Sequence, residues 1–184
     1  MKKLKLIKRR QNGFSLLEIL LVLAIAAALV IGAFIVYPKV QAAARADAES
    51  KNISTIVAGV KSLYTSSSTY TGLTNEVAIN AKIYPDNMIN GTSTTPINAW
   101  KGEVTIAAAD TGSSGVEGSS FTITYKSVPA IECAKIVSST AGNFYIMKVN
   151  DNVVKASDGV LDIAATAEKC NAGGNTNTIE LTSL

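Results

Sequence analysis

The stretch GFSLLEILLVLAIAAALVIGAFIVY, residues 13–37, decides the fold of this 184-residue chain. One ionisable side chain, Glu18, stands near its start, and nineteen apolar residues follow from Ile19 to Tyr37. At about 1.5 Å rise per helical residue, such a run spans about 30 Å, the thickness of the hydrocarbon core of a bilayer. The sequence therefore predicts a helix that can cross a membrane.

A basic segment without acidic residues precedes the apolar run. Its six basic residues are Lys2, Lys3, Lys5, Lys8, Arg9 and Arg10. The positive-inside bias keeps such an N-terminus in the cytoplasm and predicts export of the rest of the chain. Because a carboxylate inside a membrane costs up to about 3 kcal/mol, Glu18 should have a function.

Two ordinary interpretations of the N-terminus stay open. Ala42-Ala43-Ala44 offers an A-x-A site for a secretory signal peptidase, but the apolar run is longer than the roughly 7–15 residues of an ordinary signal. Alternatively, the run is an uncleaved anchor, in which case Glu18 is an interfacial residue and the Gly13-Phe14 junction has no use.

The motif GFSLLE, residues 13–18, ahead of a long apolar run resembles the prepilin peptidase site of type IV pilins and pseudopilins. The resemblance implies cleavage between Gly13 and Phe14, N-methylation of Phe14 and retention of the apolar run. Cleavage would create an α-amino group of pKa about 8, one helical turn from Glu18. We expect Glu18 of one subunit to accept the Phe14 amine of its neighbour and to set the register of assembly.

The helix is predicted to continue beyond the membrane. Apolar residues recur mostly at three- and four-residue steps after Pro38: Val40, Ala44, Ile53, Ile56, Val57, Val60, Leu63 and Tyr64. A helix from Ser15 to Tyr64 would be about 75 Å long, too long for a bilayer. We therefore expect its second half to bury an apolar face against the rest of the chain.

The remaining residues predict an α+β head with an antiparallel sheet. Strands are expected at 103–107, 121–126, 144–149, 153–155 and 178–182, with Asp151-Asn152 as a hairpin turn. Thr74 is expected to cap a short helix through Lys82, before a turn at residues 84–87. Pro129 opens a second helix, and residues 161–170 form a third. A long helix packed on such a head is the pilin fold that the resemblance implies.

Cys133 and Cys170 both lie in the exported part, where an even cysteine count favours a disulfide. A metal or redox pair is the competing interpretation, but it lacks close cysteine spacing, and the chain has no histidine. A disulfide that closes a loop of about 38 residues would stabilise the folded state by about 4 kcal/mol, because it lowers the entropy of the unfolded chain.

The expected organisation has three parts. They are a cleaved cytoplasmic leader, residues 1–13; a long helix, residues 14–64, with the membrane and assembly segment at 14–37; and an extracytoplasmic head, residues 65–184, with a disulfide-bounded region at 133–170. Six of the seventeen Lys and Arg lie in the leader, whereas all fourteen acidic residues follow it, so the mature side chains sum to −3. Nucleic-acid binding is therefore not predicted.

A search for catalytic residues finds no histidine and no phosphate-binding Gly-Lys motif, and the Ser and Thr residues have no nearby base. We therefore expect the chain to have no enzymatic activity and to bind no cofactor or metal. Two acidic pairs, Asp47 with Glu49 and Asp158 with Asp162, are interpreted as helix-surface charge and helix capping.

Segments 70–73, 85–87 and 98–103, with the long cysteine span, resemble the type IVb pilins, which include bundle-forming, toxin-coregulated and thin pilins of enteric bacteria. The resemblance implies a structural pilus subunit for adhesion, aggregation or mating contact. Its implied partners are copies of itself in a helical homopolymer, prepilin peptidase, the inner membrane and the inner-membrane pilus assembly machinery. A minor pilin or type II secretion pseudopilin stays open, as does a monomeric membrane-anchored binding domain.

Overall fold

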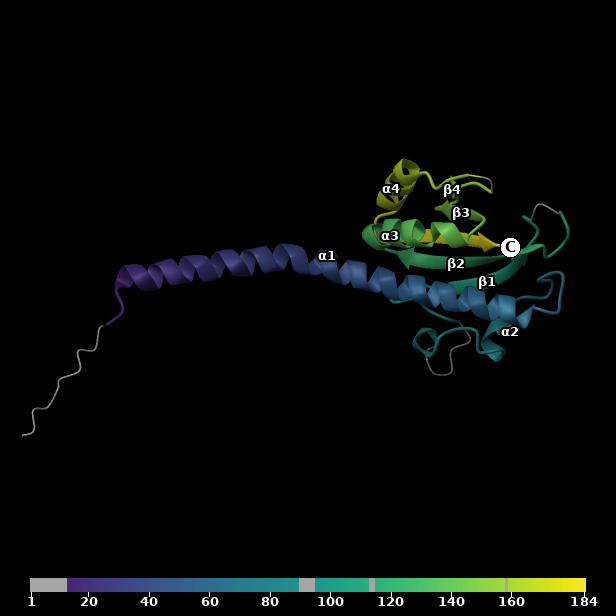
Figure 1. Ribbon diagram of the computed structural model, residues 1–184, viewed down its shortest axis with the longest axis horizontal. Coiled ribbons are helices and arrows are strands. Elements are labelled where there is room, and N and C mark those ends of the chain that lie inside the picture. Colours follow the sequence, from purple (N-terminus) through teal and green to yellow (C-terminus); the bar gives the residue numbers. More distant parts are fainter. Residues whose placement is uncertain (1–12, 90–94, 113–114, 158) are drawn as a thin grey trace, which may run out of the picture. The chain divides into compact units, whose positions relative to one another are not determined.

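The computed structural model describes residues 13–89, 95–112, 115–157 and 159–184 (Figure 1). The chain divides into two compact units: an N-terminal unit, Met1–Val40, and a C-terminal unit, Gln41–Leu184. One helix, α1 (Leu16–Leu63), begins in the first unit and ends in the second, with Pro38 inside it. The long helix expected from Ser15 to Tyr64 is therefore confirmed.

The C-terminal unit contains a five-stranded antiparallel sheet. Its strands are β1 (Val104–Ala109), β2 (Ser120–Val128), β3 (Ile146–Val149), β4 (Asn152–Lys155) and β5 (Asn177–Ser183). All five expected strands are present, and their spatial order is β1-β2-β5-β3-β4. The last strand in the sequence thus lies in the middle of the sheet.

The hairpin between β3 and β4 turns one residue earlier than expected. Val149 pairs with Asn152, so the two loop residues are Asn150 and Asp151 rather than Asp151 and Asn152. Both have positive φ, 49° and 63°, as a type I′ turn requires. Asn and Asp are the non-glycine residues that adopt this conformation most readily.

The second half of α1 packs against the sheet within the C-terminal unit. Its buried residues follow a helical repeat: Ala46, Glu49, Ile53, Ile56 and Val60. The three large apolar ones share one core cluster with alternating residues of β2, namely Phe121, Ile123 and Tyr125. Of the apolar positions expected on this face, Ile53, Ile56 and Val60 are buried and Val57 and Tyr64 are partly buried, whereas Val40, Ala44 and Leu63 are exposed.

A short helix, α2 (Asn75–Asn80), begins where expected and ends two residues before Lys82; a 3-10 helix, η1 (Asp86–Met88), follows Pro85. The Thr74 hydroxyl accepts a hydrogen bond from the Val77 amide, which confirms the expected cap. Asn75 covers the outer edge of β1, because its side chain donates to the Val104 carbonyl and accepts from the Ile106 amide. Two backbone groups at this edge of the sheet therefore have hydrogen-bond partners within the chain.

Both later helices form, although the one expected at 161–170 begins and ends two residues later. Helix α3 (Ala130–Thr140) follows Pro129 and leads into the 3-10 helix η2 (Ala141–Asn143), and α4 (Ile163–Ala172) is capped by Asp162. The Asp162 carboxylate accepts a hydrogen bond from the Ala165 amide at 2.9 Å, so its interpretation as a capping residue is confirmed. Asp158 lies outside the described residues.

Candidate functional site

The GFSLLE motif spans the entry into α1. Residues 13–15 precede the helix, and the Ser15 carbonyl accepts hydrogen bonds from the Glu18 and Ile19 amides at 3.0 and 3.2 Å. Phe14 is 79% exposed, and it lines a shallow apolar hollow together with Glu18 and Ile19. Within this unit, the motif therefore places an exposed aromatic residue and an exposed carboxylate beside one surface depression.

The described residues leave open space around Gly13. A Cβ atom built on Gly13 would have no heavy atom within 4 Å. The described structure therefore gives no packing reason for glycine at this position.

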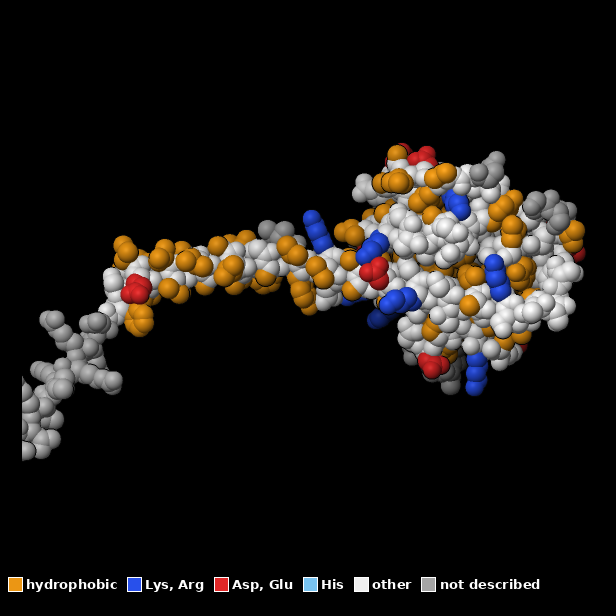
Figure 2. All heavy atoms as spheres, in the orientation of Figure 1, with side chains coloured by type: hydrophobic (Ala, Val, Ile, Leu, Met, Phe, Trp, Pro, Cys, Tyr) orange, Lys and Arg blue, Asp and Glu red, His pale blue; other side chains and the backbone are white. Residues whose placement is uncertain are grey.

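Large apolar side chains cover the N-terminal unit, and each is at least half exposed: Leu16, Leu17, Ile19, Leu20, Leu21, Val22, Leu23, Ile25, Leu29, Val30, Ile31, Phe34, Val36 and Tyr37. Figure 2 shows them as an orange coat along this part of α1. The mean hydropathy over an 18-residue window reaches 3.2, and α1 is the one helix of the described residues that is long and apolar enough to cross a membrane. Such a surface needs lipid or an apolar partner.

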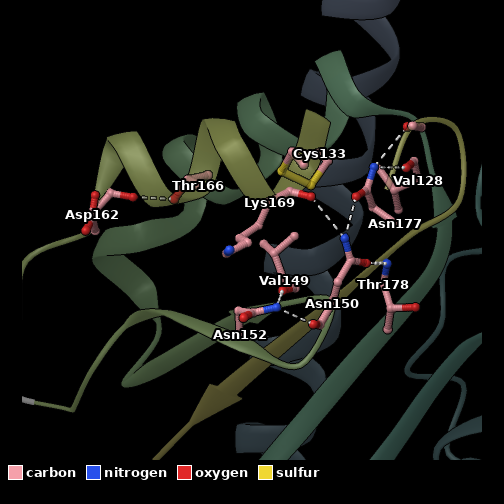
Figure 3. Close-up of a disulfide and its surroundings, with 12 residues drawn as sticks. Val128, Cys133, Val149, Asn150, Asn152, Asp162, Thr166, Lys169, Asn177 and Thr178 are labelled. Atoms are coloured by element: carbon pink, nitrogen blue, oxygen red, sulfur yellow. Dashed lines mark hydrogen bonds between the residues drawn. A yellow bond between two sulfur atoms is a disulfide. The ribbon is translucent and has the colours of Figure 1, made fainter. Parts of the chain in front are cut away.

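The expected disulfide between Cys133 and Cys170 is confirmed. It joins α3 to α4, both cysteines are buried, and their Cα atoms are 5.8 Å apart (Figure 3). The bond therefore closes a loop of sequence separation 37 that contains β3 and β4.

Two asparagine side chains, the fully buried Asn177 and the partly buried Asn150, form an amide cluster beside the disulfide (Figure 3). The Asn177 amide donates to the Val128 and Gly174 carbonyls, both at 3.0 Å, and its oxygen accepts from Asn150 at 2.8 Å. Asn150 also donates to the Lys169 carbonyl at 3.0 Å. The cluster thus connects the β3–β4 turn, the end of α4 and the start of β5. Sequence reasoning missed Asn177, because a lone asparagine at a strand start gives no sign that it is buried.

Polar contacts attach α3 to the second half of α1. Lys135 forms an ion pair with Asp47 at 3.0 Å and donates to the Ala43 carbonyl at 3.3 Å. The hydroxyls of Ser50 and Ser139 are 2.9 Å apart. Asp47 is therefore an exposed helix charge, as interpreted, although it also has a specific partner. An ion pair this exposed contributes little stability.

The interpretation of Glu49 as a surface charge is wrong. Glu49 is 2% exposed, and its carboxylate accepts hydrogen bonds from the Ala99 amide at 2.8 Å and from the Asn52 side chain at 3.3 Å. Burial raises the pKa of the Glu49 carboxyl group, while contacts with Ala99, Asn52 and Tyr125 lower it by less. The three- and four-residue spacing from Ala46 to Ile53 could have placed Glu49 on the buried face.

Among the described residues, no group of three or more His, Cys, Asp or Glu side chains could hold a metal ion. The features that distinguish the described chain are an exposed apolar helix with its motif, and a compact α+β unit with one disulfide. Together they define the class of type IV pilins.

Two family models match the chain. The model described as "PilS N terminal" matches residues 43–184, and the model described as "Prokaryotic N-terminal methylation motif" matches residues 8–34. The chain belongs to the PilS N terminal family, and its motif and fold are those of a type IVb pilin.

The curated relatives include the major structural subunit of the bundle-forming pilus from Escherichia coli O127:H6 and that from E. coli O111:H-. Each is 25% identical to this chain over 103 residues, which cover 56% of this chain and 53% of the relative. The chain therefore spans about half the length of the curated relatives it matches.

Solved structures show the same fold. A type IVb pilin from Salmonella typhi superposes with a TM-score of 0.56 at 22% identity, over 73% of this chain and 97% of that one. TcpA, a type IV pilin from Vibrio cholerae El Tor biotype, superposes with a TM-score of 0.56 at 14% identity, over 78% and 99%. The α+β class and the long N-terminal helix expected from the sequence are thereby confirmed.

Proposed function

We propose that this chain is the structural subunit of a type IVb pilus and that its role is mechanical rather than enzymatic. The observation that carries the proposal is the exposed apolar half of α1, which belongs to the same helix as a half that is packed on an α+β unit. The second half of the helix is thus packed within the C-terminal unit. The other end is available first to lipid and then to copies of the chain.

Processing by prepilin peptidase between Gly13 and Phe14 is the first step. The motif match over residues 8–34 supports it. So does the position of Gly13 and Phe14 ahead of the helix, where no backbone has to be unwound before cleavage. The open space around Gly13 is consistent with a small residue selected by the peptidase. The leader 1–13 is lost, and Phe14 becomes the methylated N-terminus.

Glu18 then receives the new amino group of a neighbouring subunit. Phe14 precedes α1 and Glu18 lies in its first turn, four residues later, so each processed subunit presents a cation and an anion at one end of its apolar helix. Unit charges about 4 Å apart attract by about 4 kcal/mol at an effective dielectric near 20, but desolvation opposes this attraction. The pair therefore sets the stagger of the helices more than it adds stability.

Hydrophobic burial drives the stacking of the helices. Segment 14–37 anchors the precursor in the inner membrane, and each apolar Å² kept from water contributes roughly 25 cal/mol. Extraction from lipid would expose these apolar side chains to water, and this cost is avoided only when neighbouring helices cover them. The inner-membrane assembly machinery carries out this transfer, and the head, residues 65–184, ends on the outside of an extracellular fibre that serves adhesion, aggregation or mating contact.

The variant Glu18→Ala tests this function. We expect it to be inserted and cleaved normally, because neither step uses the carboxylate, but to give at least tenfold fewer fibres in sheared surface material. The matched control is Glu168→Ala, which removes a carboxylate that is 73% exposed on α4 and forms an ion pair with the adjacent Lys169. Fibre yields from Glu18→Ala equal to those of the control would contradict the proposal.

A further inference from the structure

The Glu49 carboxyl group is buried at the contact between α1 and the loop of residues 97–103. It is 2% exposed, and no lysine or arginine of the described residues forms an ion pair with it. Its partners are the amide of Ala99, the side chain of Asn52 and the hydroxyl of Tyr125. These neutral donors favour the ionised form, but burial without a cationic partner opposes ionisation by more, so the pKa of the Glu49 carboxyl group is raised.

The loop that Glu49 holds is built around a buried side chain, Asn98. Its oxygen accepts from the Trp100 and Gly102 amides at 3.0 and 2.9 Å, and its nitrogen donates to the Lys126 carbonyl at 2.7 Å. Lys101 has a φ of 61°, a strained value for lysine. The loop is therefore a tight unit that is joined to α1 through the Ala99–Glu49 hydrogen bond.

The other titratable groups near Glu49 do not compensate its charge at neutral pH. From β2, the Tyr125 hydroxyl interacts with the carboxylate, and Tyr84 lies close enough to Tyr125 to interact with it. Burial raises the pKa of both phenols, so both stay neutral. The charged residues of the loop are engaged elsewhere or solvated: Glu103 pairs with Lys126 at 2.7 Å, and Lys101 is exposed.

We propose that Glu49 is an acid-tightened latch: protonation of its buried carboxyl group holds the 97–103 loop closed on α1, and ionisation favours opening of this loop. Opening exposes the carboxylate to water, where its pKa returns to the ordinary value of 4.5. The closed state binds the proton more tightly than the open state. Closure is therefore strongest in acid and weakens as pH rises from 4.5 to the pKa of the closed state.

Amide hydrogen exchange of the full chain in detergent micelles tests the latch. After correction for intrinsic exchange, the protection of the Ala99 amide should fall by up to about tenfold per pH unit between pH 4.5 and the pKa of the closed state, and should then level off. The Ala108 amide, which donates to the Leu73 carbonyl, serves as an internal reference. Constant Ala99 protection relative to Ala108 from pH 4.5 to 8 would overturn the proposal without any variant.

The isosteric variant Glu49→Gln isolates the ionisation, because it retains the size and an acceptor oxygen but cannot lose a proton. We expect its Ala99 protection to be independent of pH, whereas the control Glu168→Gln should retain the wild-type dependence. A dependence in Glu49→Gln equal to that of the wild type would assign the effect to another group and refute the latch. The latch needs only a folded C-terminal unit, so a failure of the pilus-assembly experiment leaves it standing.

Discussion

Replacement of Asn177 by alanine should destabilise the C-terminal unit strongly, because the side chain is fully buried and makes three hydrogen bonds. The variant removes the donors to the Val128 and Gly174 carbonyls and leaves one Asn150 contact unmade. A buried polar group that loses its partner costs about 1–3 kcal/mol. With partial relaxation of the β5 entry, we expect the free energy of unfolding to fall by about 2–4 kcal/mol.

Urea unfolding, followed by the fluorescence of Trp100, measures this loss, since Trp100 is the only tryptophan of the chain. The control is Asn175→Ala, two residues away and exposed, which should change stability by less than about 0.5 kcal/mol. If Asn177→Ala unfolds within 0.5 kcal/mol of the control, the amide cluster does not support the fold as inferred.

Two further predictions concern the same unit. Replacement of both Cys133 and Cys170 by serine should lower the free energy of unfolding by about 4 kcal/mol, given the sequence separation of 37 that the bond closes; urea titrations that differ by less than 1 kcal/mol would be inconsistent with this. Gly102→Ala should cost at least about 2 kcal/mol in thermal or urea unfolding, because its Cβ would lie 1.8 Å from the Lys126 carbonyl oxygen. Gly142→Ala, where a Cβ meets nothing within 4 Å, is its control, and equal losses in the two variants would refute the packing argument.

Local patterns predicted the elements of this fold well. The apolar repeat after Pro38 predicted the buried residues Ile53, Ile56 and Val60 of α1, and the strands expected at 121–126 and 178–182 lie within β2 and β5. Thr74 and Asp162 were found as caps because Thr and Asp are preferred at the N-cap, where their side-chain oxygens accept from free backbone amides. Each of these patterns can be recognised from residues that are close together in the sequence.

Features that depend on distant segments could not be predicted. The insertion of β5 between β2 and β3 depends on a pairing that no turn specifies. The burial of Asn177 depends on carbonyls from β2 and from the end of α4. Glu49 was misjudged because its charge was weighed above its spacing, and its main partner, Ala99, lies 50 residues away.

The most direct test of the central claim, that one apolar helix serves first the membrane and then the fibre, is mass spectrometry of fibres sheared from the cell surface. We expect abundant chains that begin at Phe14, carry a methylated α-amino group and retain residues 14–37. Surface material that contains only monomeric chains beginning at Met1, or chains cut after the apolar run, would contradict the account.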